Sequence, residues 1–218
     1  MIVHDPEGWN SGPYAAAIRT QQGDLSLRDA EGWCLPLDVE RWCARADVGD
    51  RAVLRRCRGR VLDIGCGAGR LVEALTRRGH TVLGIDVCSS AVSSTVGRGG
   101  AALRRSVFDP LPDEGGWGTA LLIDGNIGIG GDPRRLLRRI RGLVHGQGLL
   151  LVETAAADVD ECRRVRVHAG RHPAGAVFPW AAVGASALDR HATAAGWTAT
   201  ERWSSAGGRH FVALRARA

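Results

Sequence analysis

Lysine is absent from this chain of 218 residues, so its basic side chains are arginines and seven histidines. Phenylalanine and tyrosine, which could stack on nucleic-acid bases, are scarce, with three and one. The formal net charge of +6 attracts anions only mildly, and the arginines are scattered along the chain. These features are evidence against nucleic acid as a partner.

No two of the six cysteines are spaced as a C-x-x-C pair, so we expect no metal site. No apolar run approaches the ~20 residues that a membrane-spanning helix needs. Residues 1–14 carry polar side chains where a signal peptide would require an apolar segment. We therefore expect a cytoplasmic protein with reduced thiols and no membrane contact.

Residues 1–59 differ in pattern from the rest of the chain. Helical spacing is present in Tyr14–Thr20 and in Leu37–Cys57. We expect these residues to form a helical cap that serves as a substrate lid, placed before a main α/β domain over residues 60–218. The length suits one sizeable domain of this kind.

From Arg60 onward, short apolar runs alternate with helical patterns, which predicts a doubly wound, mostly parallel sheet with right-handed crossovers. Asp132 and Pro133 have the residue types of a helix N-cap and first position. The predicted strands are Val61–Ile64, Thr81–Asp86, Ala101–Phe108, Thr119–Ile123 and Leu149–Glu153, and the helices are Leu71–Arg78, Ser89–Val96 and 132–144.

The C-terminal part is expected to depart from this alternation. A helix over Ser186–Ala195 precedes two strands, Trp197–Trp203 and His210–Arg215, joined by a short turn that makes them an antiparallel hairpin. The sheet would then have seven strands. Residues 155–184 fit no crossover, and we expect an inserted hairpin there, with Arg163–His168 pairing with Ala176–Trp180.

A glycine-rich turn follows the first predicted strand, in the order D-x-G-x-G-x-G from Asp63 to Gly69, and Asp86 ends the next strand. Glycines allow a sharp turn and a close approach of ligand to backbone. A dinucleotide fingerprint would need glycine at position 70, where Arg70 stands. The pattern resembles motif I of the class I S-adenosylmethionine-dependent methyltransferases, over roughly residues 60–154 and more weakly over the terminal hairpin.

The resemblance implies S-adenosylmethionine as the cofactor and assigns it a set of residues. Asp63 would lie near the amino group of its methionine part, and Asp86 would hold the ribose hydroxyls. Ser106 stands where many members carry a carboxylate for the adenine, and Asp109 is either a second candidate or a turn residue. The remaining cofactor-binding residues would be Gly65, Cys66, Gly67, Gly69, Val87, Val107, Phe108 and Asp124.

In this family the loop after the fourth strand passes beside the transferable methyl group. Asp124 and Asn126 are therefore candidates for orienting the substrate or taking a proton. The alternative is that the glycines of this loop only make a tight connection. His168 is a further candidate base.

A small molecule is the expected acceptor, methylated on oxygen or nitrogen, as in the tailoring of a bacterial metabolite. The N-P-P-Y type motif of adenine methyltransferases and the Pro-Cys pair of cytosine-C5 enzymes are both absent. An RNA or protein methyltransferase and a nicotinamide-dependent oxidoreductase remain alternatives, and the oligomeric state is open. The expected substrate-binding residues are Trp9, Tyr14, Trp33, Arg166, which would suit an anionic group, and Trp180.

Overall fold

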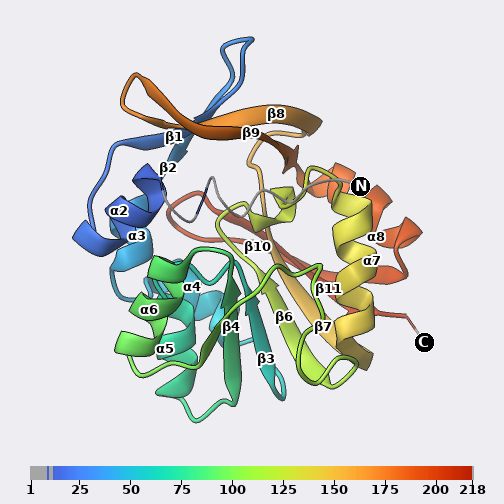
Figure 1. Ribbon diagram of the computed structural model, residues 1–218. Coiled ribbons are helices and arrows are strands. Elements are labelled where there is room, and N and C mark those ends of the chain that lie inside the picture. Colours follow the sequence, from blue (N-terminus) through green and yellow to red (C-terminus); the bar gives the residue numbers. More distant parts are fainter. Residues whose placement is uncertain (1–8, 10–11, 218) are drawn as a thin grey trace.

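The computed structural model describes residue 9 and residues 12–217, and it contains two sheets (Figure 1). The larger has the order β10-β11-β7-β6-β3-β4-β5. Strands β3 to β7 run parallel, whereas β11 joins β7 and β10 joins β11 in antiparallel fashion. The predicted α/β fold with its terminal hairpin is therefore confirmed. The strands are β3 (Val61–Ile64), β4 (Val82–Asp86), β5 (Ala102–Arg104), β6 (Trp117–Leu122), β7 (Val144–Thr154), β10 (Trp197–Ser204) and β11 (His210–Ala216).

Helices cover both faces of this sheet. On one side lie α4 (Val48–Leu54), α5 (Arg70–Thr76) and α6 (Ser89–Gly97), and on the other α7 (Pro133–Leu143) and α8 (Ala185–Ala194) (Figure 1). Two apolar clusters fill the spaces between the layers, one containing the buried faces of α7 and α8, the other those of α4 and α5. Among the described residues no helix is long and apolar enough to cross a membrane.

Helix α7 forms as its sequence predicts. The Asp132 carboxylate accepts a hydrogen bond of 2.9 Å from the Arg135 N–H, and Pro133 takes the first helical position. The apolar residues Leu136, Leu137, Ile140 and Leu143 are all buried against the sheet. One face of the helix is thus fixed in the core while its arginines face outward.

A second, four-stranded antiparallel sheet has the order β2-β1-β8-β9, and we call it the cap sheet. Strands β8 (Asp160–Ala169) and β9 (His172–Val183) are the expected inserted hairpin, longer than its predicted strands. Strands β1 (Leu25–Arg28) and β2 (Cys34–Leu37) were not predicted, because that region was expected to be helical. The described cap therefore consists of a hairpin as well as α2 (Pro13–Thr20) and α3 (Val39–Cys43).

The helical pattern predicted over Leu37–Cys57 is divided between α3 and α4. Asp38 accepts from the Arg41 N–H, and Asp47 accepts from the Asp50 N–H, so each short helix has its own N-cap. Residues Val53 and Leu54 of α4 belong to the core beneath the large sheet. The part of the chain before residue 59 is thus shared between the cap and the main body.

The third parallel strand is shorter than predicted. Strand β5 ends at Arg104, whereas the sequence pattern extends it to Phe108. A turn stops it: the Ser106 N–H donates to the Asp109 carboxylate at 3.0 Å, and the Asp109 N–H donates to the Ser106 carbonyl at 3.1 Å. Asp109 is therefore a turn residue.

Candidate active site

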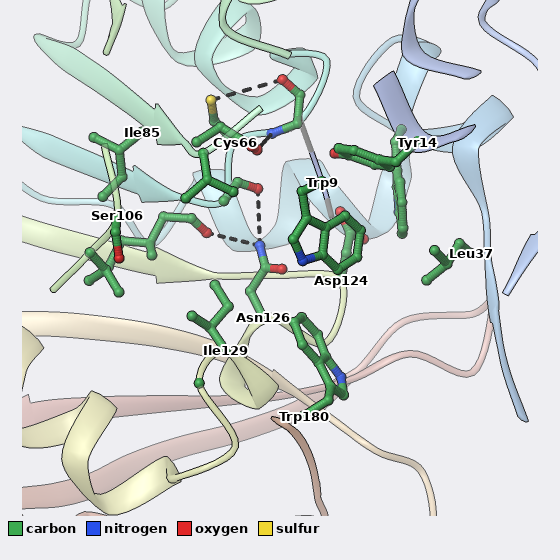
Figure 2. Close-up of a pocket in the computed structure, with 18 of the residues that line it drawn as sticks. Trp9, Tyr14, Leu37, Cys66, Ile85, Ser106, Asp124, Asn126, Ile129 and Trp180 are labelled. Carbon is green, nitrogen blue, oxygen red and sulfur yellow. Dashed lines mark hydrogen bonds between the residues drawn. The ribbon is translucent and has the colours of Figure 1, made fainter. Parts of the chain in front are cut away.

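A cleft lies between the cap sheet and the carboxyl ends of the parallel strands (Figure 2). It spans about 1190 Å³, a volume that includes space open to solvent. Three segments line it: the glycine-rich turn after β3, the loop after β6, and the aromatic residues of the cap. The bridge between Ile129 and Trp180 fixes the cap sheet to the loop after β6.

The three glycines of the turn all have positive φ, at 70°, 54° and 88°, but serve different purposes. A Cβ on Gly65 would meet the Asn126 amide at 2.6 Å, and one on Gly69 would meet Thr95 of α6 at 2.5 Å. A Cβ on Gly67 would have only the Tyr14 hydroxyl nearby, at 3.7 Å. Gly67 is therefore the glycine whose missing side chain keeps the cleft open, while Gly69 lies behind the cleft wall and serves helix packing.

Asp86, at the end of β4, lines the cleft beside this turn. Its carboxylate accepts hydrogen bonds from the Gly67 N–H at 3.0 Å and from the Cys88 N–H at 2.8 Å. Burial raises the pKa of Asp86, although these N–H groups oppose the shift. The two bonds fix the carboxylate at the place that the sequence predicts for a ribose contact.

Asp63 lies beneath the turn and is not part of the cleft wall. It is 2% exposed, and its Oδ2 atom has no hydrogen-bond partner among the described residues. Burial raises the pKa of Asp63 to about 7, against the opposing charge of Arg70. The sequence analysis expects this carboxylate beside the cofactor's amino group. In the structure Asp63 does not reach the cleft, so its charge would influence that amino group only across the backbone of the turn.

Arg70, which the sequence analysis used only to exclude a dinucleotide turn, is a central residue of the site. Its guanidinium pairs with Asp50 at 2.8 Å and with Asp124 at 2.7 Å, and its side chain is 4% exposed. Asp50 is fully buried, and the charges of Arg70 and Arg209 hold its pKa below the usual range against the effect of burial. Arg70 therefore connects α4, α5 and the loop after β6.

Asp124 is held by three arginines. Arg70 donates to both of its oxygens, Arg41 donates to Oδ1 at 2.8 Å, and Arg209 lies at 3.4 Å. Burial alone would raise the pKa of Asp124, but the charges of Arg70 and Arg41 outweigh it and lower the pKa. The backbone of Asp124 has a φ of 60°, and its N–H donates to Glu153 at 2.8 Å. A carboxylate paired in this way is a poor proton acceptor.

Asn126 is positioned by the glycine-rich turn. Its amide nitrogen donates to the carbonyls of Ile64 and Gly65 at 2.9 and 3.0 Å (Figure 2). These bonds use both N–H groups, which leaves the amide oxygen to accept from a ligand in the cleft. Asn126 can therefore orient a substrate, but it supplies no base.

The wall expected to receive an adenine ring is only partly as predicted. Val87, Ser106 and Val107 line the cleft, and so do Ile85 and Arg105, which the sequence analysis did not select. Phe108 lies outside the cleft, packed against the core with the Arg135 guanidinium 4.5 Å from its ring centroid. Because β5 ends early, the turn at Ser106 directs Phe108 away from the site.

Aromatic rings from three separate segments form the other half of the cleft. Trp9 lies 4.9 Å from Tyr14, 5.2 Å from Phe178 and 6.2 Å from Trp180, measured between ring centroids. Trp42 of α3 completes the group at 6.4 Å from Tyr14. Figure 2 shows Trp9 in the middle of the cleft, between the turn at Cys66 and Trp180. Sequence spacing brings none of these residues together except Phe178 and Trp180.

Three predicted site residues lie outside the cleft. Trp33 packs beneath Arg163, whose guanidinium is 5.6 Å from the ring centroid. Arg166 and His168 alternate with the buried Val165 and Val167 along β8, so their side chains are on the opposite face of the cap sheet. The structure therefore does not bring His168, Trp33 or Arg166 into the cleft.

The described residues contain no cluster of histidine, cysteine, aspartate and glutamate arranged to hold a metal. Cys66 is the one cysteine that lines the cleft in that part of the chain. Burial raises the pKa of the Cys66 thiol well above its usual value, so the thiol stays protonated. The polar side chains that line the cleft include Tyr14, Asp86, Arg105, Ser106 and Asn126.

Comparison with known proteins identifies the fold. A family model described as "Methyltransferase domain" matches residues 40–202. A SAM-dependent methyltransferase from Bacteroides fragilis, solved in complex with S-adenosyl-L-homocysteine, is 20% identical, with a TM-score of 0.78. The match covers 100% of this chain and 98% of that protein. No curated protein matches.

Two further structures are similar over a smaller part. The 1,6-didemethyltoxoflavin-N1-methyltransferase of Burkholderia thailandensis is 18% identical, with a TM-score of 0.58 and coverage of 78% and 77% of the two chains. The sugar N-methyltransferase KedS8 of Streptoalloteichus sp. is 14% identical, with a TM-score of 0.58 and coverage of 81% and 88%. The family match decides against a nicotinamide enzyme: the chain belongs to the methyltransferase domain family and is an S-adenosylmethionine-dependent methyltransferase.

Proposed function

We propose that this methyltransferase acts on a small molecule with a substantial apolar surface, bound between the glycine-rich turn and the cap. The observation that carries the proposal is the construction of the acceptor half of the cleft. Its walls come from the N-terminal segment, α3 and β9, and they are mostly aromatic and aliphatic. Enclosure of this kind suits a compact ligand, whereas a polymer needs an open track.

The residues present fit the cofactor. Gly67 leaves open space beside Asp86, whose fixed carboxylate can accept from ribose hydroxyls, and Ile85, Val87 and Val107 offer an apolar wall for a base. The bound cofactor supplies an activated methyl group on a sulfonium. We propose that the chain's part is to position the acceptor in line with it, which can account for much of the acceleration.

Asn126 is the residue that we propose to orient the acceptor. Its oxygen faces the cleft while both N–H groups are fixed on Ile64 and Gly65. We assign Asp124 a structural role in this proposal, since its charge is neutralised by Arg70 and Arg41.

The acceptors of the neighbouring structures agree with a small substrate. One neighbour is an N-methyltransferase of 1,6-didemethyltoxoflavin, another of a sugar, and MtfA of a glycopeptide. At 14–18% identity these proteins support the size class of the substrate and say nothing of its structure.

The test is transfer of labelled methyl from S-adenosylmethionine to a bacterial lysate that is afterwards separated into protein, RNA and small-molecule fractions. We expect the label in the small-molecule fraction. Asp86→Ala is the control for background, because loss of a charged hydrogen-bond acceptor weakens cofactor binding, by about 1.5–3 kcal/mol. Label that depends on the intact enzyme but is found in RNA or protein would overturn the proposal.

A further inference from the structure

In the part of the chain that the structure describes, the acceptor half of the cleft offers no group that can remove a proton. Among the described residues that line the cleft, the titratable ones are Tyr14, Cys66, Arg70, Asp86, Arg105 and Asp124. Burial and the charge of Asp86 raise the pKa of Tyr14 well above its usual value, so its hydroxyl stays neutral. Asp124 is paired with arginines, and Asp86 is bonded to two backbone N–H groups.

An acceptor in this cleft must therefore arrive with its lone pair free. An anionic oxygen would lose its hydration against aromatic walls, and desolvation of an unpaired anion is costly. Of the two arginines that line the cleft, Arg70 is already engaged by Asp50 and Asp124, and Arg105 lies on the wall beside Ser106. A neutral nitrogen with an available lone pair avoids both difficulties.

The aromatic rings also suit the charge that such a reaction produces. A cation is attracted to a ring face within about 6 Å of the centroid. The rings of Trp9, Tyr14, Phe178 and Trp180 contact one another, with centroids 4.9 to 6.4 Å apart, and all four residues line the cleft, so they present one continuous aromatic surface to a ligand. Figure 2 shows Trp9, Tyr14 and Trp180 on the side of the cleft away from Ser106.

On the basis of the proposed function, we propose that the acceptor atom is the neutral nitrogen of an amine and that these four rings stabilise the positive charge it acquires. The nitrogen lone pair forms the new N–C bond. The C–S bond breaks, and its electron pair remains on sulfur, which becomes the neutral thioether of S-adenosylhomocysteine. The positive charge passes from sulfur to nitrogen, and any proton on the ammonium is lost to water after release.

The charge preference can be measured with two compounds of equal shape, choline and its uncharged carbon analogue 3,3-dimethylbutan-1-ol. Both are titrated against the protein saturated with S-adenosylhomocysteine, with ligand-observed NMR as the readout. We expect choline to bind about tenfold more tightly, the scale of a desolvated cation–π contact. Equal binding, tighter binding of the alcohol, or no binding of either would overturn the inference.

Variants identify the rings responsible. Trp180→Leu keeps an apolar side chain but removes the π face, so the choline preference should fall several-fold, whereas Trp180→Phe should retain most of it. Trp33→Leu, outside the cleft beneath Arg163, is the matched control and should leave the preference unchanged. Binding of S-adenosylhomocysteine by each variant reports that the protein is folded. A preference that survives in Trp180→Leu would contradict the assignment.

The product separates this inference from the proposed function. Methyl label attached to oxygen, sulfur or carbon of a small molecule would exclude nitrogen as the acceptor atom and leave the proposed function intact. Label on RNA or protein would remove the proposed function itself. Label on the nitrogen of a small molecule supports both.

Discussion

At the scale of single residues, Asp63 is the side chain whose charge the fold opposes most directly. It is buried, one of its oxygens has no partner among the described residues, and burial raises its pKa from an ordinary 3.8 to about 7. Between these values the folded protein holds a proton that the unfolded chain has released. The stability contribution of this residue is therefore fully present below pH 3.8 and is lost as the pH rises from there to about 7.

We predict that Asp63→Asn abolishes this dependence. Near pH 3 the variant and the natural protein should have similar free energies of unfolding, because Asp63 is then protonated in both the folded and the unfolded state. Near pH 8 the variant should be more stable, by up to about 4 kcal/mol, since an amide needs no ionisation. Urea unfolding at both pH values measures the difference. A difference that does not change with pH would show that Asp63 is not ionised in this interval.

Some site residues could be predicted from sequence and others could not, for a physical reason. The residues Gly65, Gly67 and Asp86 lie at or just after the ends of strands, where local spacing determines their place. Arg70 meets Asp124, 54 positions away, and Trp9 meets Trp180, so their roles depend on tertiary packing. His168 was predicted as a base from its residue type alone, and the alternation of β8 turns it to the other face.

At the scale of elements, the arginine cluster around Asp124 joins α3, α4, α5, β7 and the turn before β11. Arg70 and Arg209 both pair with the buried Asp50, and Arg209 also pairs with Glu153 at 2.7 Å. Breaking a buried pair leaves an uncompensated charge, whereas removing both partners costs much less. The cluster therefore fixes the positions of several elements relative to one another.

We predict that Arg70→Met lowers the free energy of unfolding by about 3–5 kcal/mol. The double variant Asp50→Asn/Arg70→Met should be less destabilised than Arg70→Met alone, because one buried carboxylate no longer lacks its partner. Arg190→Met, which removes an exposed pair with Asp160, is the control and should cost less than about 1 kcal/mol. A double variant as unstable as the sum of its parts would contradict the buried-charge explanation.

Contact between β9 and the loop after β6 depends on a small residue. Gly128, in η1 (Asn126–Gly128), faces the Ala181 carbonyl and the Trp180 indole, and a Cβ there would meet them at 2.3 and 2.5 Å. Backbone cannot yield at such distances, so a methyl group would displace β9 from the site.

Gly128→Ala should therefore reduce methyl transfer severely, about 100-fold if the acceptor is displaced by an ångström. Binding of S-adenosylhomocysteine should change little, because hydrogen bonds to Ile85 and Asp86 of β4 hold the glycine-rich turn. Gly142→Ala is the matched control: it lies in α7 with no atom within 4 Å of the added Cβ, and alanine there should be neutral or slightly stabilising. Equal loss of cofactor binding and transfer in Gly128→Ala would mean that the whole site, and not the β9 wall, has been disturbed.

Elements with local signals were predictable, and elements defined by distant pairing were not. Helix α7 has its cap, its proline and its apolar face within twelve residues. Strands β1 and β2 have four residues each, and β1 is completed by β8, more than 130 residues away. Their short apolar runs are also compatible with a helix, which is why the region was expected to be helical.

At the scale of the whole molecule, the cap and the main body share their cores. One apolar cluster unites Tyr14 and Ile18 of α2 with the cap sheet and with Ala68 and Ala91 of the main body. Arg19 donates to Ser90 at 3.1 Å across the same contact. Apolar packing is therefore continuous across the predicted boundary at residue 59.

We predict that the chain unfolds in a single cooperative transition that includes the cap. Tryptophan fluorescence, which reports mainly on the cap and the terminal hairpin, and far-UV circular dichroism, which reports on all elements, should give the same midpoint. S-adenosylhomocysteine at about 100 times its dissociation constant should add about 2.7 kcal/mol and raise both midpoints together, by roughly 5–10 °C for a domain of this size. NADH and NADPH are the control ligands and should leave them unchanged. An earlier fluorescence transition, insensitive to the cofactor, would show that the cap unfolds on its own and that Tyr14 and Trp9 leave the site before the main body does.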